Sequence, residues 1–418
     1  MKLHKITTGL RTSMNNFIGL KPNTPLTIQT IKEVQEKFWP GTPGIQAFLC
    51  TDLWNACDEA VNGTIKELSH TTQRSTSSQV TPVKSKRLKK PVICSTREGL
   101  DLTLELKQHD NELIVDSVCI NPGGSSINIA RALNSFGTSF KLIGINGIGI
   151  RSDIFTKLLK REGLDISNFI DINNDIRFHF CTFIEGKEYW VPSPPPFLDH
   201  DELDRFTTQL FNACDNQKGE ALAFANNPPL GASETYMADI IKETTDRFGM
   251  FTIYDTKLKV AKRELVDSVL KVGPSMIKPN IAEYAEIVGL DESKLRHDRD
   301  LIAHLAQELI NKYDMKMILV SLDKDGAMLI DKKRAAVVNG LPIKVVSTVG
   351  AGDSGIAATI DRSKKEGYSL KKLNDEQFKK TLSAFLAAGS ATATKPGTEL
   401  GSLEEVQNME KQVKVSFI

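Results

Sequence analysis

The sequence lacks several features that would point to particular classes of protein. Its 418 residues carry 53 Lys and Arg against 52 Asp and Glu, and this balance argues against a dedicated nucleic-acid binder. Six cysteines occur without a CxxC pair, which is typical of free thiols in a reducing compartment rather than of a disulfide scaffold. The histidines show no metal-site spacing, and no apolar run is long enough to predict a membrane span. The remaining composition is that of an ordinary globular protein.

Charge is distributed unevenly, and this sets the first part of the chain apart. Residues 1–92 hold 13 Lys and Arg against 6 Asp and Glu. Residues 1–32 contain five Lys or Arg and no acid, a composition typical of an organelle-targeting segment or of a disordered basic tail. The free thiols favour a cytoplasmic protein, and the basic first 32 residues make targeting to an organelle the alternative.

Hydrophobic periodicity and composition divide the chain into three parts. Apolar residues recur every three or four positions in 27–38 and 49–68, which predicts short amphipathic helices. Eight of the 13 residues in 69–81 are Ser or Thr, and a basic run follows at 84–90, so this stretch is interpreted as a linker. The predicted parts are a helical extension at 1–68, a linker at 69–90 and a main domain at 91–418.

The main domain alternates short apolar strands with amphipathic helices. This pattern predicts an α/β fold with a parallel sheet covered on both faces. Strand-like runs at about 101–120 and 175–191 are joined by short polar segments, and they are predicted to form a small separate sheet.

A motif of small residues, Val346-Ser-Thr-Val-Gly-Ala-Gly-Asp-Ser354, is the most distinctive stretch of the chain. It follows a predicted strand at 342–346 and opens a predicted helix that runs from Asp353 to about residue 364. Backbone N–H groups at such a helix start bind anions, phosphate above all. Asp353 is interpreted either as an N-cap or as a general base placed where a hydroxyl meets a transferable phosphate.

Two further motifs place polar residues at helix starts. Gly123 and Gly124 open a helix that carries Asn128, although a loop with an N-cap serine would give the same pattern. Asn280 and Glu283 lie three residues apart after a strand that ends at Lys278. They could hold magnesium-bound water and phosphate oxygens, or form an ordinary helix cap.

Together the three motifs resemble the ribokinase/phosphofructokinase-B family of carbohydrate kinases, and Ser347 resembles the sugar-phosphate kinase branch. The resemblance runs from about residue 91 to the end of the chain. It implies a ribokinase-like three-layer α/β/α sandwich, with a mostly parallel central sheet and a small β-sheet lid. The helical N-terminal region is extra to this fold.

The resemblance also implies an activity, which is ATP-dependent phosphorylation of a sugar phosphate such as a fructose or tagatose phosphate, with Mg²⁺ bridging the phosphates near Glu283 through water. Asp353 would take the hydroxyl proton, and backbone N–H groups of Gly350, Ala351 and Gly352 would stabilise the transferring group. Implied sugar-phosphate contacts are Asp101, Gly123, Gly124, Asn128, Arg177 and Asn226. Implied ATP contacts are Lys278, Asn280, Ser321, Gly326, Ser347, Val349 and Lys395.

Some residues leave alternatives open. Arg177 could be an ordinary surface arginine on a strand, and Ser125, Ser126 and Asn226 depart from the family pattern near the sugar. The alternatives are a catalytically impaired sugar- or nucleotide-binding regulatory protein and a kinase for an unphosphorylated sugar or nucleoside. Lid strands in this family often pair across a dimer, so the expected partners are a sugar phosphate, ATP and a second copy of the chain, without nucleic acid or membrane.

Overall fold

The computed structural model describes residues 89–109, 112–184, 187–225, 227–257 and 263–418, which all belong to one compact unit, Lys86–Ile418. The predicted helical extension, the targeting segment and all but the last two residues of the predicted linker lie outside the described residues, as does Asn226. Within the described part of the chain, no helix is both long and apolar enough to cross a membrane.

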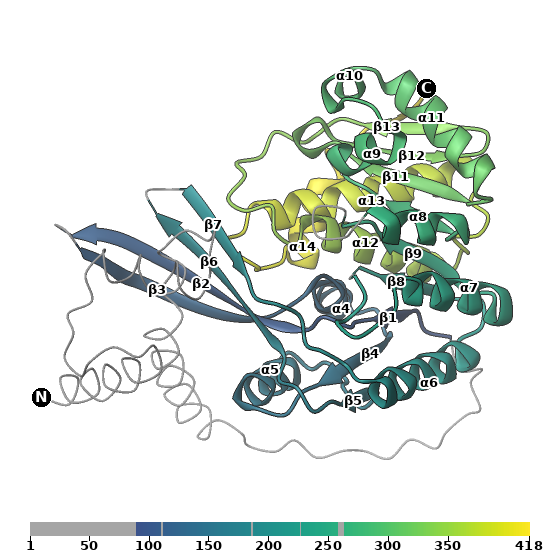
Figure 1. The fold of residues 1–418 in the computed structure, drawn as a ribbon. Helices are drawn as coiled ribbons and strands as arrows, with labels where there is room; N and C mark the ends of the chain where they lie inside the picture. Colours follow the sequence, from purple (N-terminus) through teal and green to yellow (C-terminus); the bar gives the residue numbers. More distant parts are fainter. Residues whose placement is uncertain (1–88, 110–111, 185–186, 226, 258–262) are drawn as a thin grey trace, which may run out of the picture. The chain divides into compact units, whose positions relative to one another are not determined.

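The main sheet has ten strands in the described part of the chain (Figure 1). Their order is β14-β13-β12-β11-β10-β9-β8-β1-β4-β5; pairing is parallel from β5 to β11 and antiparallel from β11 to β14. The central strands are buried along their whole length, as expected for a sheet covered on both faces. The strands are β1 Val92–Cys94, β4 Lys141–Asn146, β5 Phe169–Asp171, β8 Ala221–Phe224, β9 Phe251–Asp255, β10 Met276–Lys278, β11 Met317–Ser321, β12 Ala327–Asp331, β13 Ala335–Val338 and β14 Val415–Phe417.

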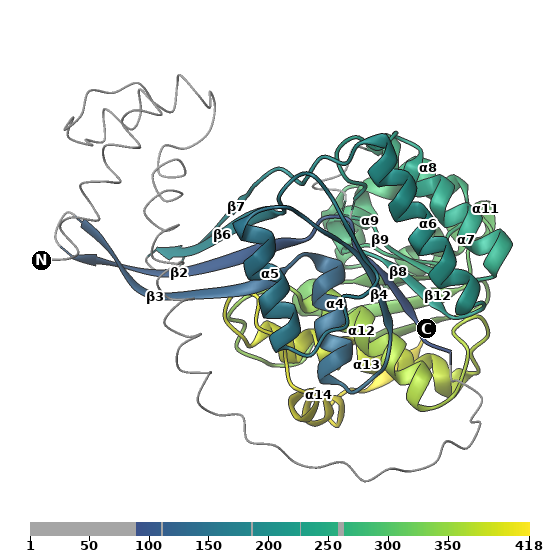
Figure 2. The same cartoon turned by 90° about the horizontal axis from the view of Figure 1, so that it is seen from below.

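Helices cover both faces of this sheet (Figure 2). One face packs against α6 to α11 through a continuous apolar core. The opposite face carries α4, α12 and α13, with α14 packed beside α13. The helices are α4 Ser125–Ser135, α5 Ile150–Arg161, α6 His200–Asn216, α7 Tyr236–Phe248, α8 Arg263–Lys271, α9 Ile281–Val288, α10 Glu292–Arg296, α11 Arg299–Lys312, α12 Ala351–Lys365, α13 Asp375–Ala393 and α14 Leu403–Glu410.

A second, four-stranded sheet projects from the three-layer body (Figure 1). Its order is β3-β2-β6-β7, with β2 parallel to β6 and the other pairs antiparallel. Helix α5 packs against β2 and β3. The three-layer sandwich with a small additional sheet is therefore confirmed. The four strands are β2 Gly99–His109, β3 Glu112–Gly123, β6 Arg177–Ile184 and β7 Lys187–Pro192.

The strand predicted at 342–346 is wrong. No strand forms there among the described residues, and Val345 and Val346 are 52% and 44% exposed. The backbone N–H of Val346 donates instead to the carbonyl of Ala393, at the end of α13, at 2.9 Å. Two β-branched residues do not make a strand where no neighbouring strand offers a ladder of hydrogen bonds.

Candidate functional site

The candidate site lies where the carboxyl ends of β9 and β10 meet the first turn of α12. Ligands bind at this edge in open α/β sheets, because loops and helix starts converge there. Asp255 is the last residue of β9 and Lys278 is the last residue of β10. A Cβ built on Gly352 would lie 2.8 Å from the Lys278 Nζ, which places this lysine against the start of α12.

The first turn of α12 has no side-chain cap, and the Ala351 N–H donates to the Thr348 carbonyl at 3.3 Å. Gly350 is the N-cap residue in the left-handed conformation (φ 77°), and it makes no side-chain cap to the helix. A side chain at Gly352 would displace the Lys278 ammonium, so this glycine permits a close approach. Uncapped N–H groups at a helix start favour an anion, and the adjacent ammonium adds to that preference.

Asp353 is a residue of the first turn and not the N-cap, so the capping interpretation of its side chain is wrong. Its side chain is 4% exposed. The Oδ2 atom accepts a hydrogen bond from the Asn128 side-chain amide at 2.9 Å. The Oδ1 atom has no hydrogen-bond partner among the described residues, and the Lys257 Nζ lies 3.6 Å from it. The carboxylate is therefore held through Oδ2, whereas Oδ1 is buried and accepts no hydrogen bond from the described residues.

The Gly-Gly turn before α4 brings the small sheet to the same place. Gly124 is the N-cap of α4 with φ 108° and has no side-chain cap, so the serine-cap alternative is also wrong. A Cβ on Gly123 would lie 2.0 Å from an oxygen of the Asp101 carboxyl, so only glycine fits beside this acid.

Asp101 is buried on β2, and its Oδ1 has no hydrogen-bond partner among the described residues. Burial raises the pKa of Asp101 to about 7, although Arg177 and Arg131 act in the opposite direction. Arg177, which starts β6, is half-buried. Burial lowers the pKa of Arg177, and the charges of Asp101 and Glu98 act in the opposite direction. This environment differs from that of the surface arginine considered as an alternative.

A buried ion-pair chain was not predicted from the sequence. The Lys278 Nζ lies 3.0 Å from Asp255 Oδ1, and the Lys257 Nζ lies 2.8 Å from Asp255 Oδ2. Burial of Asp255 raises its pKa, but the two lysines outweigh this, and the net pKa is below its usual value. The signal that could have found Asp255 was an acid at the carboxyl end of a buried parallel strand.

Asn280 and Glu283 form the reciprocal capping box of α9. The Asn280 side chain accepts from the Glu283 backbone N–H at 2.8 Å, and Glu283 Oε2 accepts from the Asn280 N–H at 3.0 Å. The Thr256 hydroxyl donates to the same Oε2 at 3.0 Å. The capping alternative is thus confirmed, and the cap fixes the Glu283 carboxylate beside the end of β9. Among the described residues, no cluster of three or more His, Cys, Asp or Glu could hold a metal on its own.

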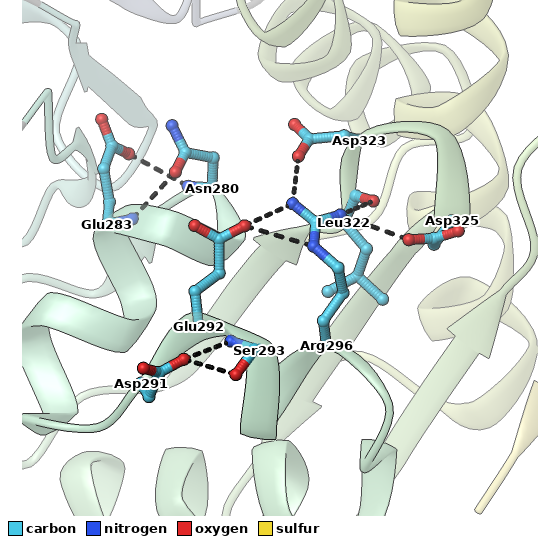
Figure 3. A network of polar contacts seen from close by, with 9 residues as sticks. All are labelled: Asn280, Glu283, Asp291, Glu292, Ser293, Arg296, Leu322, Asp323 and Asp325. Atoms are coloured by element: carbon cyan, nitrogen blue, oxygen red, sulfur yellow. Dashed lines mark hydrogen bonds and ion pairs between the residues drawn. The ribbon is translucent and has the colours of Figure 1, made fainter.

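The turn between β11 and β12 is tied to the same region (Figure 3). The backbone N–H of Ser321 donates to the carbonyl of Pro279 at 3.0 Å. Gly326 adopts φ 109°, and a Cβ there would lie 1.9 Å from the Val338 carbonyl oxygen. Arg296 of α10 pairs with Asp323 at 2.9 Å and with Asp325 at 3.2 Å, and it holds the turn against α10.

The remaining residues implied by the resemblance lie around α12 and α13. Ser347 is buried, and its hydroxyl accepts from the Val349 N–H at 3.3 Å. Lys395, just after α13, pairs with Glu405 of α14. The structure therefore brings Asp353, Asn128 and Lys278 into one site with the unpredicted Asp255 and Lys257, and the nucleotide roles of Ser347, Val349 and Lys395 stay predictions.

Comparison with known proteins gives a consistent result. The family described as pfkB family carbohydrate kinase matches residues 99–405. The chain is 27% identical over 286 residues to a tagatose-6-phosphate kinase of Staphylococcus epidermidis, covering 66% of this chain and 87% of that one. It is 26% identical over 291 residues to the ATP-dependent 6-phosphofructokinase isozyme 2 of Escherichia coli, covering 69% and 86%. The crystal structure of Escherichia coli phosphofructokinase-2 in complex with potassium matches with a TM-score of 0.67 at 25% identity, covering 78% and 99%. The chain belongs to the pfkB family of carbohydrate kinases.

Proposed function

We propose that this pfkB-family kinase transfers the γ-phosphoryl group of ATP to a hydroxyl of a sugar phosphate. The observation that carries the proposal is the buried Asp353 carboxylate at the start of α12. Asn128 holds its Oδ2, and its Oδ1 accepts no hydrogen bond from the described residues. The proposed acceptors are fructose 6-phosphate, fructose 1-phosphate and tagatose 6-phosphate, because relatives are named as a 6-phosphofructokinase, a 1-phosphofructokinase and a tagatose-6-phosphate kinase.

In the proposed reaction, Asp353 Oδ1 accepts the proton of the attacking hydroxyl. General-base assistance of this kind contributes roughly 10²–10⁴-fold to the rate. The backbone N–H groups of Gly350, Ala351 and Gly352 stabilise the charge on the transferring group, and Lys278 adds a cation at the same helix start. Asp101, next to Gly123, accepts a hydrogen bond from a sugar hydroxyl through Oδ1, which has no partner among the described residues.

The residues fit a magnesium ion bound mainly by the nucleotide phosphates. Such a site needs only one or two protein carboxylates, often through water, and not a full protein cage. Glu283, fixed by its capping box and by Thr256, supplies the nearby carboxylate. The bound ion would neutralise charge on the phosphates as the group is transferred.

Release of ADP tests the proposal directly. Purified full-length chain with Mg²⁺-ATP would be offered the three sugar phosphates above, free sugars and nucleosides. Release with a sugar phosphate supports the proposal. Release only with a free sugar or nucleoside would assign the other kinase class, and no release with any acceptor would favour a regulatory binding protein.

An Asp353→Asn variant tests the base. We expect it to lose most of the turnover and to retain ATP affinity within a few-fold, because the amide cannot accept the proton. The matched control is Asp239→Asn, an exposed acid in the first turn of α7, which should keep the wild-type rate. A wild-type rate for Asp353→Asn would refute the base assignment.

A homodimer through the small sheet is also proposed. β3 is one edge of that sheet, and its Ile114 and Val115 are 48% and 42% exposed. An exposed edge strand with apolar side chains is a template for pairing with a second chain. Sedimentation of the wild type and of Ile114→Lys should give a dimer and a weakened dimer, whereas monomers in both samples would contradict the proposal.

A further inference from the structure

Lys257 lies inside the candidate site, where the proposed function has given it no role. It follows β9 by two residues. Its Nζ is 2.8 Å from Asp255 Oδ2 and 3.6 Å from Asp353 Oδ1, and its side chain is 31% exposed. The ammonium therefore bridges a buried acid and the proposed general base.

The backbone at this position is strained in a way that places the side chain. Lys257 has φ 43°, in the left-handed region that a lysine rarely adopts. Conformations of this kind persist only where the surroundings impose them, and they are concentrated at functional sites. The left-handed turn directly after β9 accompanies a lysine side chain that points back to the acids.

Neutralising Asp255 does not require this lysine. Lys278 already pairs with Asp255 at 3.0 Å, and its side chain is only 6% exposed. Lys257 is thus a second cation, and it is the one that also approaches Asp353 Oδ1. Burial lowers its pKa, but the carboxylates of Asp255 and Asp353 raise it more, so Lys257 stays charged.

On the basis of the proposed function, we propose that Lys257 is a catalytic residue whose ammonium contacts the transferring phosphoryl group. A hydroxyl hydrogen-bonded to Asp353 Oδ1 lies about 2.7 Å from that atom. The Lys257 Nζ is 3.6 Å from the same atom, so both the ammonium and the attacking oxygen lie next to Asp353 Oδ1.

The proposed step is an ordinary phosphoryl transfer. The acceptor oxygen bonds to the γ-phosphorus while the bond from that phosphorus to the β–γ bridging oxygen breaks, and ADP leaves with the electron pair. The hydroxyl proton goes to Asp353 Oδ1. Lys257 neutralises negative charge on the non-bridging oxygens, where a fixed cation is most effective because it needs no reorganisation.

Three variants test this role in the full-length chain. We expect Lys257→Met to lower kcat by about 10²–10³-fold, as for loss of one preorganised donor, with ATP affinity changed only a few-fold. Affinity for ADP–aluminium fluoride with the sugar phosphate should fall by the same factor as kcat/KM. Lys257→Arg should recover part of the rate, and Lys271→Met, an exposed lysine in the last turn of α8, should behave as wild type.

A double variant separates catalysis from charge balance. If Lys257 only neutralises Asp255, adding Asp255→Asn to Lys257→Met should restore the rate, and that result would overturn the inference. Wild-type kcat in Lys257→Met, measured in an enzyme that is active, would overturn it as well. A wild-type chain that releases no ADP with any acceptor would instead overturn the proposed function, and the inference with it.

Discussion

The side-chain amide of Asn128 donates to Asp353 Oδ2 at 2.9 Å, across 225 positions of sequence. Asn128 lies on α4 and Asp353 on α12, two helices that pack side by side on one face of the main sheet (Figure 2). Both side chains are buried, so the hydrogen bond fixes the carboxylate where water does not compete for it. This contact joins the helix that follows the Gly-Gly turn to the start of α12, where we propose that phosphate binds.

Removing this amide should slow the reaction without unfolding the protein. We expect Asn128→Ala to lower kcat by roughly 10- to 100-fold, since a hydrogen bond to a charged group contributes about 1.5–3 kcal/mol. Steady-state kinetics with the best acceptor measure the effect. Asn134→Ala, which removes an exposed hydrogen bond from the same helix, is the control and should leave kcat unchanged. An unchanged kcat in Asn128→Ala would mean that the hydrogen bond does not position the base.

The buried carboxyl of Asp101 should make stability depend on pH. Burial raises its pKa from 3.8 to about 7, so the folded protein binds a proton that the unfolded chain releases above about pH 4. Stability from this group is therefore greatest below about pH 4, is lost as pH rises to about 7, and levels off above that pH.

Asp101→Asn isolates this contribution. Relative to wild type, the free energy of unfolding of the variant should rise by about 1.4 kcal/mol per pH unit between pH 5 and 7. Urea unfolding at several pH values measures it. Thr103→Val, on the same strand, changes no titratable group, so its difference from wild type should not vary with pH. A constant difference for Asp101→Asn would contradict the raised pKa.

Gly326 should be irreplaceable for both steric and conformational reasons. At φ 109°, with a Cβ 1.9 Å from the Val338 carbonyl oxygen, alanine would force the β11–β12 turn to shift. We expect Gly326→Ala to destabilise the fold by about 3 kcal/mol or more. Gly289→Ala is the matched control, because Gly289 has φ 72° with nothing within 4 Å of a built Cβ, and it should cost about 1–2 kcal/mol. Equal losses in urea unfolding would show that the contact with Val338 is easily relieved.

Arg296 should affect the KM for ATP without contacting the reacting groups. It pairs with Glu292, Asp323 and Asp325 and holds the turn that the family resemblance places against ATP (Figure 3). We expect Arg296→Ala to raise KM for ATP roughly fivefold, about 1 kcal/mol, with little change in kcat. Arg247→Ala, which breaks an exposed pair within α7, should change neither constant. A fall in kcat with constant KM would contradict a positioning role.

Local sequence determined much of the fold. Alternating apolar strands and amphipathic helices were sufficient for the parallel sheet and its two helical layers, because burial on both faces demands that pattern. The prediction of a strand at 342–346 is wrong because β-branched residues do not form a strand without a neighbouring strand to pair with. The N-cap alternative for Asp353 is wrong because Gly350 takes the N-cap position in a left-handed conformation.

Motifs in the chain were enough to predict the family, a helix start near Asp353 and the residues expected around a sugar and a nucleotide. Motifs carry that information because close backbone approach requires glycine at fixed spacing. Only the tertiary structure placed Asn128 on Asp353, Asp101 against Gly123, and Lys257 and Lys278 on Asp255. Asn128 and Asp353, and Lys278 and Asp255, come from elements far apart in the chain, and their distances are set by packing of the sheet and its layers. Lys257 in particular belongs to none of the sequence motifs, and its position between Asp255 and Asp353 depends on the left-handed turn after β9.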